Sequence, residues 1–411
     1  MKRRVVITGM GALSPIGNTA CEMWENAKNG VCGIDYIKSF DASEHKVKVA
    51  GELKGFDPLE HMSKMESRRT ARFTQLAIVA AREAFKQSGL DMEKEDPSRC
   101  GVNISSGIGG LPTIEEEHYK GAKRGFDRVS PLFVPMAITN MAAGMVAIEF
   151  GFTGSATCMV TACASATNAI GEAFRQIRDG YADVFLTGGA ESCISELGIG
   201  GFTAMRALSE SENPNRASIP FDKERNGFVM GEGAGVLLLE EYEHAVARGA
   251  AIIAEVSGYG VSCDANHMTA PLEDGSGAGN CMKNALLDAK IKAEDIGYIN
   301  AHGTSTPMND RGETKAVKLA FGDHAYKLCV SSTKSMTGHL LGASGGIEAV
   351  ITACALKDGF VPPTVNYITP DDECDLDVVP NVGKEIELEY AMSNSLGFGG
   401  HNASIILKKF R

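Results

Sequence analysis

Long apolar runs are missing from this sequence, so nothing in it predicts a membrane span of about 18 residues. Its start, Met1–Arg4 followed by three apolar residues, resembles a signal peptide only loosely, because Gly9, Gly11 and Pro15 interrupt the apolar stretch too early. The eleven cysteines include no Cys-x-x-Cys pair, and no spacing of cysteine and histidine suits zinc. We therefore predict a cytoplasmic protein with reduced thiols and no bound metal.

Positive charge is also in short supply. Lysine and arginine number 40 against 52 acidic residues, which gives a formal net charge of −12. This balance argues against general binding to nucleic acids or anionic membranes, and an acidic partner would need a local basic patch. The length of 411 residues and the 44% hydrophobic content are typical of a globular enzyme with two or three domains.

The most informative residue is Cys163, within the segment Thr-Ala-Cys-Ala-Ser-Ala. Residues 156–161 are predicted to form a strand and residues 164–178 a helix. A sulfur over a helix N-terminus meets unpaired N–H groups that favour the thiolate. The alternative is an ordinary buried cysteine. The context favours a nucleophile but does not identify what it attacks.

Strands and helices alternate along the chain. The predicted strands are 4–8 (entering a glycine-rich turn), 100–105, 183–187, 234–239, 252–256 and 297–301, and the predicted helices include 70–87, 241–247 and 278–289. Near-continuous apolar strands between helices predict sheets that are covered on both faces.

The chain also repeats itself. Segment 164–180 is echoed by 343–359, and segment 11–15 by 303–307. Chance is the alternative, because glycine, serine and alanine are common, but two echoes in strand-to-helix settings favour duplication. We predict two similar halves, residues 1–250 and 251–411, with Cys163 near their junction.

Two histidines lie in turns of similar character. His302 follows a predicted strand, His339 follows Lys334 and precedes a helix that opens on small residues, and residues 394–401 form a glycine-rich turn able to offer backbone N–H groups. Each histidine alone would most often be structural. One cysteine with one histidine would suit hydrolysis. Two neutral imidazole N–H groups aimed at one thioester carbonyl would instead favour an enolate, as carbon–carbon bond formation requires.

At this point a family resemblance is evident. The segments TACASA, NAHGTSTPMND, SSTKSMTGH, GASGG and NSLGFGGHN are similar to those of the β-ketoacyl-acyl-carrier-protein synthases of the thiolase superfamily, above all the elongating enzymes of bacterial fatty acid synthesis. The resemblance runs from Val5 to the C-terminus. It implies a thiolase-like fold of duplicated α/β halves in an αβαβα layering, a homodimer, and acyl carrier protein as partner. It also implies no cofactor beyond the phosphopantetheine that arrives on the carrier.

The resemblance assigns the chemistry to three side chains. Cys163 would hold the acyl chain as a thioester, with the backbone N–H groups of Cys163 and Phe398 as the oxyanion hole. His302 and His339 would bind the malonyl thioester, promote loss of carbon dioxide and stabilise the enolate. Lys334 would set the charge around the second histidine, with Glu313 as its carboxylate partner. For this pair, a structural buried ion pair is the alternative.

The remaining implied roles concern substrate binding. Thr304 and Thr306 would hold the pantetheine arm. Ile108 would line the acyl pocket, Phe133 would reach the partner subunit's pocket, and the Phe398 side chain would gate entry. For Ile108 and Phe133, core packing is the alternative.

Carrier docking is expected at exposed arginines, although a solvated face is the alternative. Arg68 and Arg69 are placed at the start of the helix predicted from Thr70, where cations are mildly unfavourable, and Arg128 and Arg206 are added to them. Alternatives for the whole chain are a ketosynthase of polyketide or specialised lipid synthesis and a non-catalytic chain-length partner subunit. The intact Cys163 counts against the latter.

Overall fold

Ten strands form one hydrogen-bonded sheet in the computed structural model, which describes residues 2–411. Their order is β10-β9-β13-β14-β8-β1-β7-β6-β4-β5. The strands are β1 (Val5–Leu13), β4 (Cys100–Ser105), β5 (Ala156–Thr157), β6 (Val184–Glu191), β7 (Gly233–Glu241), β8 (Ala254–Cys263), β9 (Ile296–Asn300), β10 (Cys329–Ser331), β13 (Tyr390–Gly397) and β14 (His401–Lys409). Two short ribbons pair β2 (Asp35–Tyr36) with β3 (Val49–Ala50), and β11 (Phe360–Val361) with β12 (Lys384–Glu385).

Helices cover the sheet and fill the space between its halves. They are α1 (Ala20–Lys28), α2 (Lys64–Arg69), α3 (Arg72–Ser88), α4 (Leu111–Arg124), α5 (Phe133–Ala137), α6 (Met141–Phe150), α7 (Ser165–Arg178), α8 (Glu196–Ala204), α9 (Tyr242–Ala247), α10 (Ser276–Ala289), α11 (Pro307–Phe321), α12 (Lys334–Thr337) and α13 (Ser344–Asp358). No helix within residues 2–411 is long and apolar enough to cross a membrane.

The two halves of the sheet share one topology. In each half the strand order, counted along that half, is third, second, fourth, fifth, first. The strand directions also agree: β4 and β5 are parallel like β9 and β10, and β1 and β7 are antiparallel like β8 and β14. Within the ten-stranded sheet, the pairing of Val5–Ile7 of β1 with Ala254–Val256 of β8 connects the two halves.

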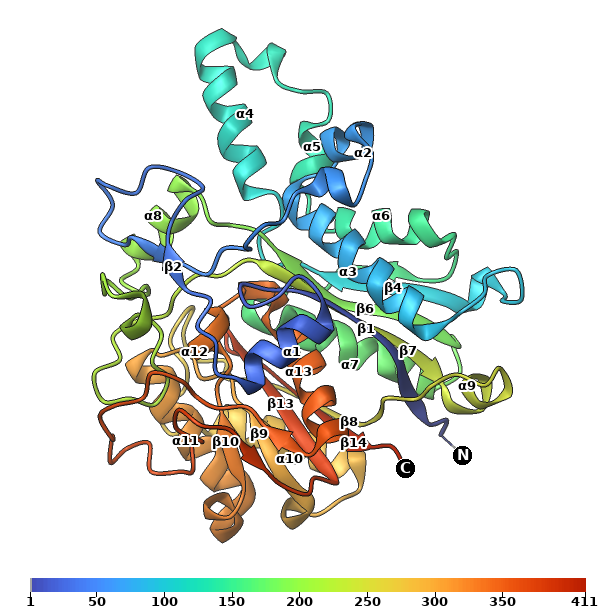
Figure 1. Ribbon diagram of the computed structural model, residues 1–411, viewed down its shortest axis with the longest axis vertical. Helices are drawn as coiled ribbons and strands as arrows, with labels where there is room; N and C mark the ends of the chain where they lie inside the picture. Colours follow the sequence, from blue (N-terminus) through green and yellow to red (C-terminus); the bar gives the residue numbers. More distant parts are fainter. Residues whose placement is uncertain (1) are drawn as a thin grey trace.

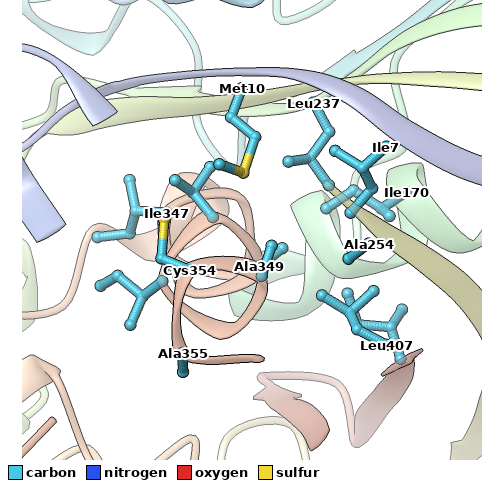
Figure 2. Close-up of a cluster of buried hydrophobic side chains, with 14 of the residues drawn as sticks. Ile7, Met10, Ile170, Leu237, Ala254, Ile347, Ala349, Cys354, Ala355 and Leu407 are labelled. Atoms are coloured by element: carbon cyan, nitrogen blue, oxygen red, sulfur yellow. The ribbon is translucent and has the colours of Figure 1, made fainter. Parts of the chain in front are cut away.

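Five layers result, as Figure 1 shows. Helices α3 and α6 cover the outer face of the N-terminal half, and α10 covers that of the C-terminal half. Helices α7 and α13 contact strands of both halves and form the middle layer. Figure 2 shows the core around them, where Met10 and Leu237 of one half approach Ile347 of α13 and Ile170 of α7. The predicted thiolase-like αβαβα layering is confirmed.

A pair of glycines recurs in the first strand of each half. A Cβ at Gly9 or Gly11 of β1 would overlap backbone atoms of α3, and one at Gly258 or Gly260 of β8 would overlap backbone atoms of α10. The close helix therefore requires glycine at these positions. Strand β1 does not end in the predicted turn but runs on to Leu13, because residues 9–13 pair with Ala234–Leu238 of β7.

The second predicted repeat, 11–15 with 303–307, is therefore wrong. Segment 11–15 ends the first strand of its half, whereas 303–307 follows β9, the second strand. The repeat of 164–180 with 343–359 corresponds to helices α7 and α13.

Local structure around Cys163 also departs from the expected strand-to-helix junction. Strand β5 has only two residues, and the chain then enters a 3-10 turn, η4 (Ala162–Ala164), directly before α7. The equivalent turn of the other half, η8 (Leu341–Ala343), precedes α13. Ala162 and Leu341 have φ of 49° and 47°, left-handed values that L-residues rarely adopt. Both halves therefore use the same strained turn to enter a central helix.

Candidate active site

A cavity of about 540 Å³ opens where the turns of the two halves meet. Cys163 enters it from the N-terminal half, and His302, His339 and Phe398 enter it from the C-terminal half. The Cys163 sulfur and one ring nitrogen of each histidine all lie within 4.8 Å of one another. The cavity thus brings one nucleophile and two imidazoles into contact with the same small volume.

Turn η4 holds Cys163 at the N-terminus of α7, where it is 8% exposed. The backbone N–H groups of Phe398 and of Cys163 itself are directed at the sulfur, and together with the Lys334 charge they favour the thiolate. Burial acts in the opposite direction and dominates, raising the pKa of the Cys163 thiol to about 12. The N–H groups therefore act in the expected direction, and burial outweighs them in setting the pKa of the Cys163 thiol.

His302 is held through its backbone and its ring. The backbone N–H groups of His302 and Gly303 each donate to a carboxylate oxygen of Glu313 at 2.8 Å. The Lys334 ammonium donates to the His302 carbonyl at 2.6 Å and lies 3.4 Å from Nδ1 of the ring. Since an ammonium has no acceptor, this contact favours the tautomer with the proton on Nε2.

His339 is held through the Nδ1 atom of its ring and through packing of that ring. Its Nδ1 lies 2.8 Å from the Ser344 hydroxyl at the start of α13, and its ring packs edge-on against Phe228. Its Nε2 is buried without a hydrogen-bond partner. The two histidine rings stand nearly perpendicular, with centroids 5.2 Å apart. This leaves Nε2 of His339 available to a ligand in the cavity.

Both histidines are neutral at pH 7. Burial lowers the pKa of His302 and of His339 well below the ordinary value, and the positive charge of Lys334 lowers both further. The neutral His302 ring, with its proton on Nε2, can donate a hydrogen bond to an oxygen that becomes negative, and His339 can do the same when its Nδ1 accepts from the Ser344 hydroxyl.

Lys334 pairs with Glu348 of α13, and both side chains are 1% exposed. The expected direct pair of Lys334 with Glu313 is wrong. Glu313 binds backbone N–H groups instead, and burial raises its pKa to about 7. Glu348 was missed because it lies on the apolar helix α13, where sequence alone gives no sign of a buried ion pair.

Cys163, His302 and His339 also form a set able to ligate a metal ion such as zinc. The Lys334 contact opposes this use, because it places a proton on the His302 Nε2 that a metal would need. The absence of a metal stays a prediction.

Comparison with known proteins agrees with this geometry. A family model described as "Beta-ketoacyl synthase, N-terminal domain" matches residues 2–245, and "Beta-ketoacyl synthase, C-terminal domain" matches residues 253–368. The chain belongs to the β-ketoacyl synthase family. It is 54% identical to 3-oxoacyl-[acyl-carrier-protein] synthase 2 of Staphylococcus aureus (strain COL) over 99% of both chains. The enzyme of the same name from Synechocystis is 49% identical over 100% of this chain and 99% of the relative.

Solved structures share the whole fold of this synthase. A type II polyketide ketosynthase in complex with its acyl carrier protein superposes with a TM-score of 0.93 at 36% identity, covering 100% of both chains. A β-ketoacyl synthase from Burkholderia phymatum STM815 has a TM-score of 0.91 at 35% identity over 100% of both chains.

Several further predicted residues line the same cavity of the synthase. These are Ile108, Thr304, Thr306, Phe398 and Arg206. The two threonine hydroxyls lie 3.0 Å apart, and the Phe398 ring lies 6.4 Å from that of Phe202. The chain reverses after Phe398 through Gly399 and Gly400, whose φ values of 84° and 74° require glycine. Lys334 and Glu313 lie behind the cavity wall rather than in it.

The other predicted residues lie apart. Phe133, at the start of α5, is half-buried and does not line the cavity. Arg68 and Arg69 are exposed in the last turn of α2, where cations are favourable, and do not begin the next helix. Arg128 is exposed in the turn after α4.

Sequence reasoning missed much of the cavity lining. Phe202 and Met308 line it, as do Asp264 and Asn402, which bind each other at 2.7 Å. The segment NSLGFGGHN contains Asn402 and could have suggested that residue. For Phe202, on α8, the sequence offers no local signal.

Proposed function

We propose that this chain is an elongating β-ketoacyl-[acyl-carrier-protein] synthase of fatty acid synthesis, and that the residues of the cavity carry out the condensation. The observation that carries the assignment of roles is the convergence of Cys163, His302 and His339 within 4.8 Å beside two N–H groups aimed at the sulfur.

The first half-reaction transfers the acyl chain. The Cys163 sulfur attacks the thioester carbonyl of an acyl carrier protein, the new S–C bond forms, and the carrier's thiol leaves with the proton. The N–H groups of Cys163 and Phe398 stabilise the tetrahedral oxyanion. Because the thiol pKa is about 12, attack is coupled to loss of its proton rather than starting from a standing thiolate.

The second half-reaction makes the carbon nucleophile. The Nε2–H groups of His302 and His339 bind the carbonyl oxygen of a malonyl thioester, whose C–C bond to the carboxylate breaks with release of carbon dioxide. The resulting enolate attacks the acyl carbonyl on Cys163. A C–C bond forms, the C–S bond breaks, and the released Cys163 thiolate takes a proton from water.

Fatty acid elongation is favoured over polyketide synthesis. The relatives named as synthase 2 are 49–54% identical to this chain, whereas the polyketide ketosynthase is 36% identical. The intact Cys163 argues against a non-catalytic chain-length partner. Incubation with malonyl carrier and acyl carriers separates the alternatives: a single condensation per acyl chain supports elongation, and repeated unreduced condensation supports polyketide synthesis.

Acyl carrier protein would dock on exposed basic residues, one of which lies at the rim of the cavity. Arg206 stands exposed at the rim, and Arg68, Arg69 and Arg128 are exposed on α2 and after α4, which lie at the same end of the molecule in Figure 1. Thr304 and Thr306 line the path that the pantetheine arm would take. Changing both Arg68 and Arg69 to Glu should raise KM for the carrier-borne substrate at low salt. The charge-matched variant Lys86→Glu/Lys283→Glu should not, and equal effects would contradict this docking site.

A second copy of the chain would cover the free edge of β5. This edge strand is exposed, and Ile148 of α6 and Val160 beside it are 72% and 52% exposed. An unpaired sheet edge next to exposed apolar side chains is a template for pairing with another chain. Sedimentation should give a dimer, and Ile148→Lys with Val160→Lys should give a folded monomer. A wild-type monomer would contradict the homodimer and the role of Phe133 in a partner's pocket.

The test of the activity is acylation of the enzyme. The protein is incubated with acyl carrier proteins bearing chains of graded length, digested, and mapped by mass spectrometry. We expect one thioester, on Cys163, and none on the buried Cys281, which serves as an internal control. Absence of a thioester on Cys163 with every chain would contradict the proposed function.

A further inference from the structure

The turn that carries Cys163 has a counterpart in the other half whose N–H groups are already occupied. In turn η8 the residue equivalent to Cys163 is Gly342, because α7 and α13 begin two residues after each. Its N–H donates at 3.0 Å to Oε2 of Glu191, at the end of β6. At Cys163 the corresponding N–H is directed at the sulfur of the same residue.

Glu191 gathers donors from both halves. Its Oε2 also accepts from Gly107 N–H at 2.7 Å. Its Oε1 accepts from the hydroxyl of Ser106 at 2.7 Å, from Ile108 N–H at 3.3 Å and from the thiol of Cys193 at 3.5 Å. The carboxyl group is 0% exposed, and burial raises its pKa while its hydrogen-bond donors counteract that shift.

The donors belong to the wall of the active-site cavity. Gly107 and Ile108 line the cavity from the N-terminal half, and Leu341, next to Gly342, lines it from the C-terminal half. Ile108, Leu341 and Cys193 also pack in one apolar cluster. The space between the two backbones is closed, because a Cβ at Gly342 would overlap the backbone nitrogen of Gly107. One buried carboxylate therefore ties two facing wall segments together.

We propose that Glu191 is a positioning residue that fixes the wall of the acyl pocket at Ile108 and Leu341, and thereby sets how long an acyl chain Cys163 can accept. The inference rests on the proposed function, since it concerns the acyl chain held on Cys163. Glu191 touches no substrate, and it acts through the backbone that carries Ile108.

Glu191→Gln is a mild test of this role. With the amide oxygen facing Gly107 and Gly342, both backbone bonds persist, and the amide NH₂ can donate to the Ser106 hydroxyl. Ile108 N–H then loses its acceptor, so the wall loosens at Ile108 while the turn of Gly342 stays in place.

The measurement is kcat/KM for transfer to Cys163 from two carriers, one with the longest chain that the wild type accepts well and one two carbons longer. One methylene in a fitted pocket changes the rate about tenfold or more. The chain-length ratio is kcat/KM for the shorter chain divided by kcat/KM for the chain two carbons longer. We expect this ratio to be about tenfold or more lower in Glu191→Gln than in the wild type. The matched control is Glu83→Gln. Glu83 accepts from the N–H groups of Ala12 and Ala20, outside the cavity lining.

A second readout separates positioning from simple loss of stability. The negative charge of Glu191 contributes to the raised pKa of Cys163, so Glu191→Gln should move the pH profile of Cys163 alkylation to lower pH. Glu83→Gln should leave that profile unchanged. If Glu191→Gln does not fold, Ser106→Ala removes one donor from the same carboxylate and should change the chain-length ratio in the same direction.

The outcomes are distinct. A ratio within twofold of the wild type in Glu191→Gln and in Ser106→Ala, or an equal change in Glu83→Gln, would overturn the role of Glu191 and leave the proposed function intact. Failure of the wild type to acylate Cys163 with any carrier would overturn both.

Discussion

The two halves of this protein use one scaffold for different chemistry. Each half has the same strand order, a Gly-x-Gly pair beneath its outer helix, and a 3-10 turn with a left-handed residue before its central helix. At that turn the N-terminal half places Cys163 and the C-terminal half places Gly342. The comparison teaches that one backbone frame serves two purposes: beside Gly342 the carboxyl group of Glu191 occupies the N–H of the turn, whereas the turn of Cys163 lines the cavity.

The largest expected effect comes from substitutions at Cys163 and Gly342, the equivalent residues of the two turns. Cys163→Ala should lower acyl transfer by at least about 10³-fold, because the nucleophile is lost, with little change in Tm. Gly342→Ala should instead destabilise the fold by about 1–3 kcal/mol, because its Cβ would overlap Gly107. Enzyme assays and thermal unfolding of the two variants check this. A stable Gly342→Ala variant would mean that the turns are not packed as described.

Lys334→Met tests how the C-terminal half holds its catalytic histidine His302. Breaking its buried pair leaves the Glu348 charge uncompensated, which costs about 3–5 kcal/mol. Malonyl decarboxylation should fall by about 10–100-fold, by analogy with the loss of a partner that orients a metal-ligating histidine. Adding Glu348→Gln should restore part of the stability and none of the activity.

The control is Lys384→Met, which breaks a partly exposed pair with Asp377. Lys384→Met should change the free energy of unfolding and the rate of malonyl decarboxylation little, since exposed pairs contribute about 0–1 kcal/mol. If Lys334→Met behaved like this surface variant, the lysine would have no part in holding His302.

The glycine pairs sharpen the comparison, because the halves should respond alike. Gly11→Ala and Gly260→Ala should each lower the free energy of unfolding by about 1–3 kcal/mol, since each Cβ meets a helix backbone that cannot yield freely. Half-buried Gly200 on α8 has open space around a Cβ, so Gly200→Ala is the control. Denaturant unfolding checks this, and a large difference between Gly11→Ala and Gly260→Ala would argue against equivalent packing.

The smallest effect concerns pH. With the pKa of the Cys163 thiol raised to about 12, its thiolate fraction is small at pH 8 and grows about tenfold per pH unit above that. Alkylation of Cys163 should therefore keep rising beyond pH 9, where a free small thiol has levelled off. A plateau below pH 8 would mean that the helix N-terminus outweighs burial.

The sequence predicted correctly those features of the protein that a local pattern determines. Cys163, His302 and His339 were placed by motif, and α7 and α13 were matched as a repeat because their spacing is local. The predicted strand ended too early because the glycines of β1 are typical of a turn, whereas pairing with β7 continues the strand and the close helix α3 requires the glycines. Motif reading therefore succeeded where one segment carries the signal.

Contacts between distant segments escaped it. Lys334 was paired with Glu313 although Glu348 is its partner, because the choice depends on how α13 lies beside α12. Glu191 gave no signal at all, since its five donors come from segments that lie as far apart as Ser106 and Gly342. Such pairings arise from tertiary packing, which no short pattern encodes.

The central claim is that the N-terminal half holds the acyl chain while the C-terminal half makes the carbanion. Separate assays of the two half-reactions in Cys163→Ala, His302→Ala and His339→Ala test it most directly. We expect Cys163→Ala to release carbon dioxide from malonyl carrier without accepting an acyl chain. Both histidine variants should form the Cys163 thioester without releasing carbon dioxide. Loss of both half-reactions in each of the three variants would contradict the division of labour between the halves.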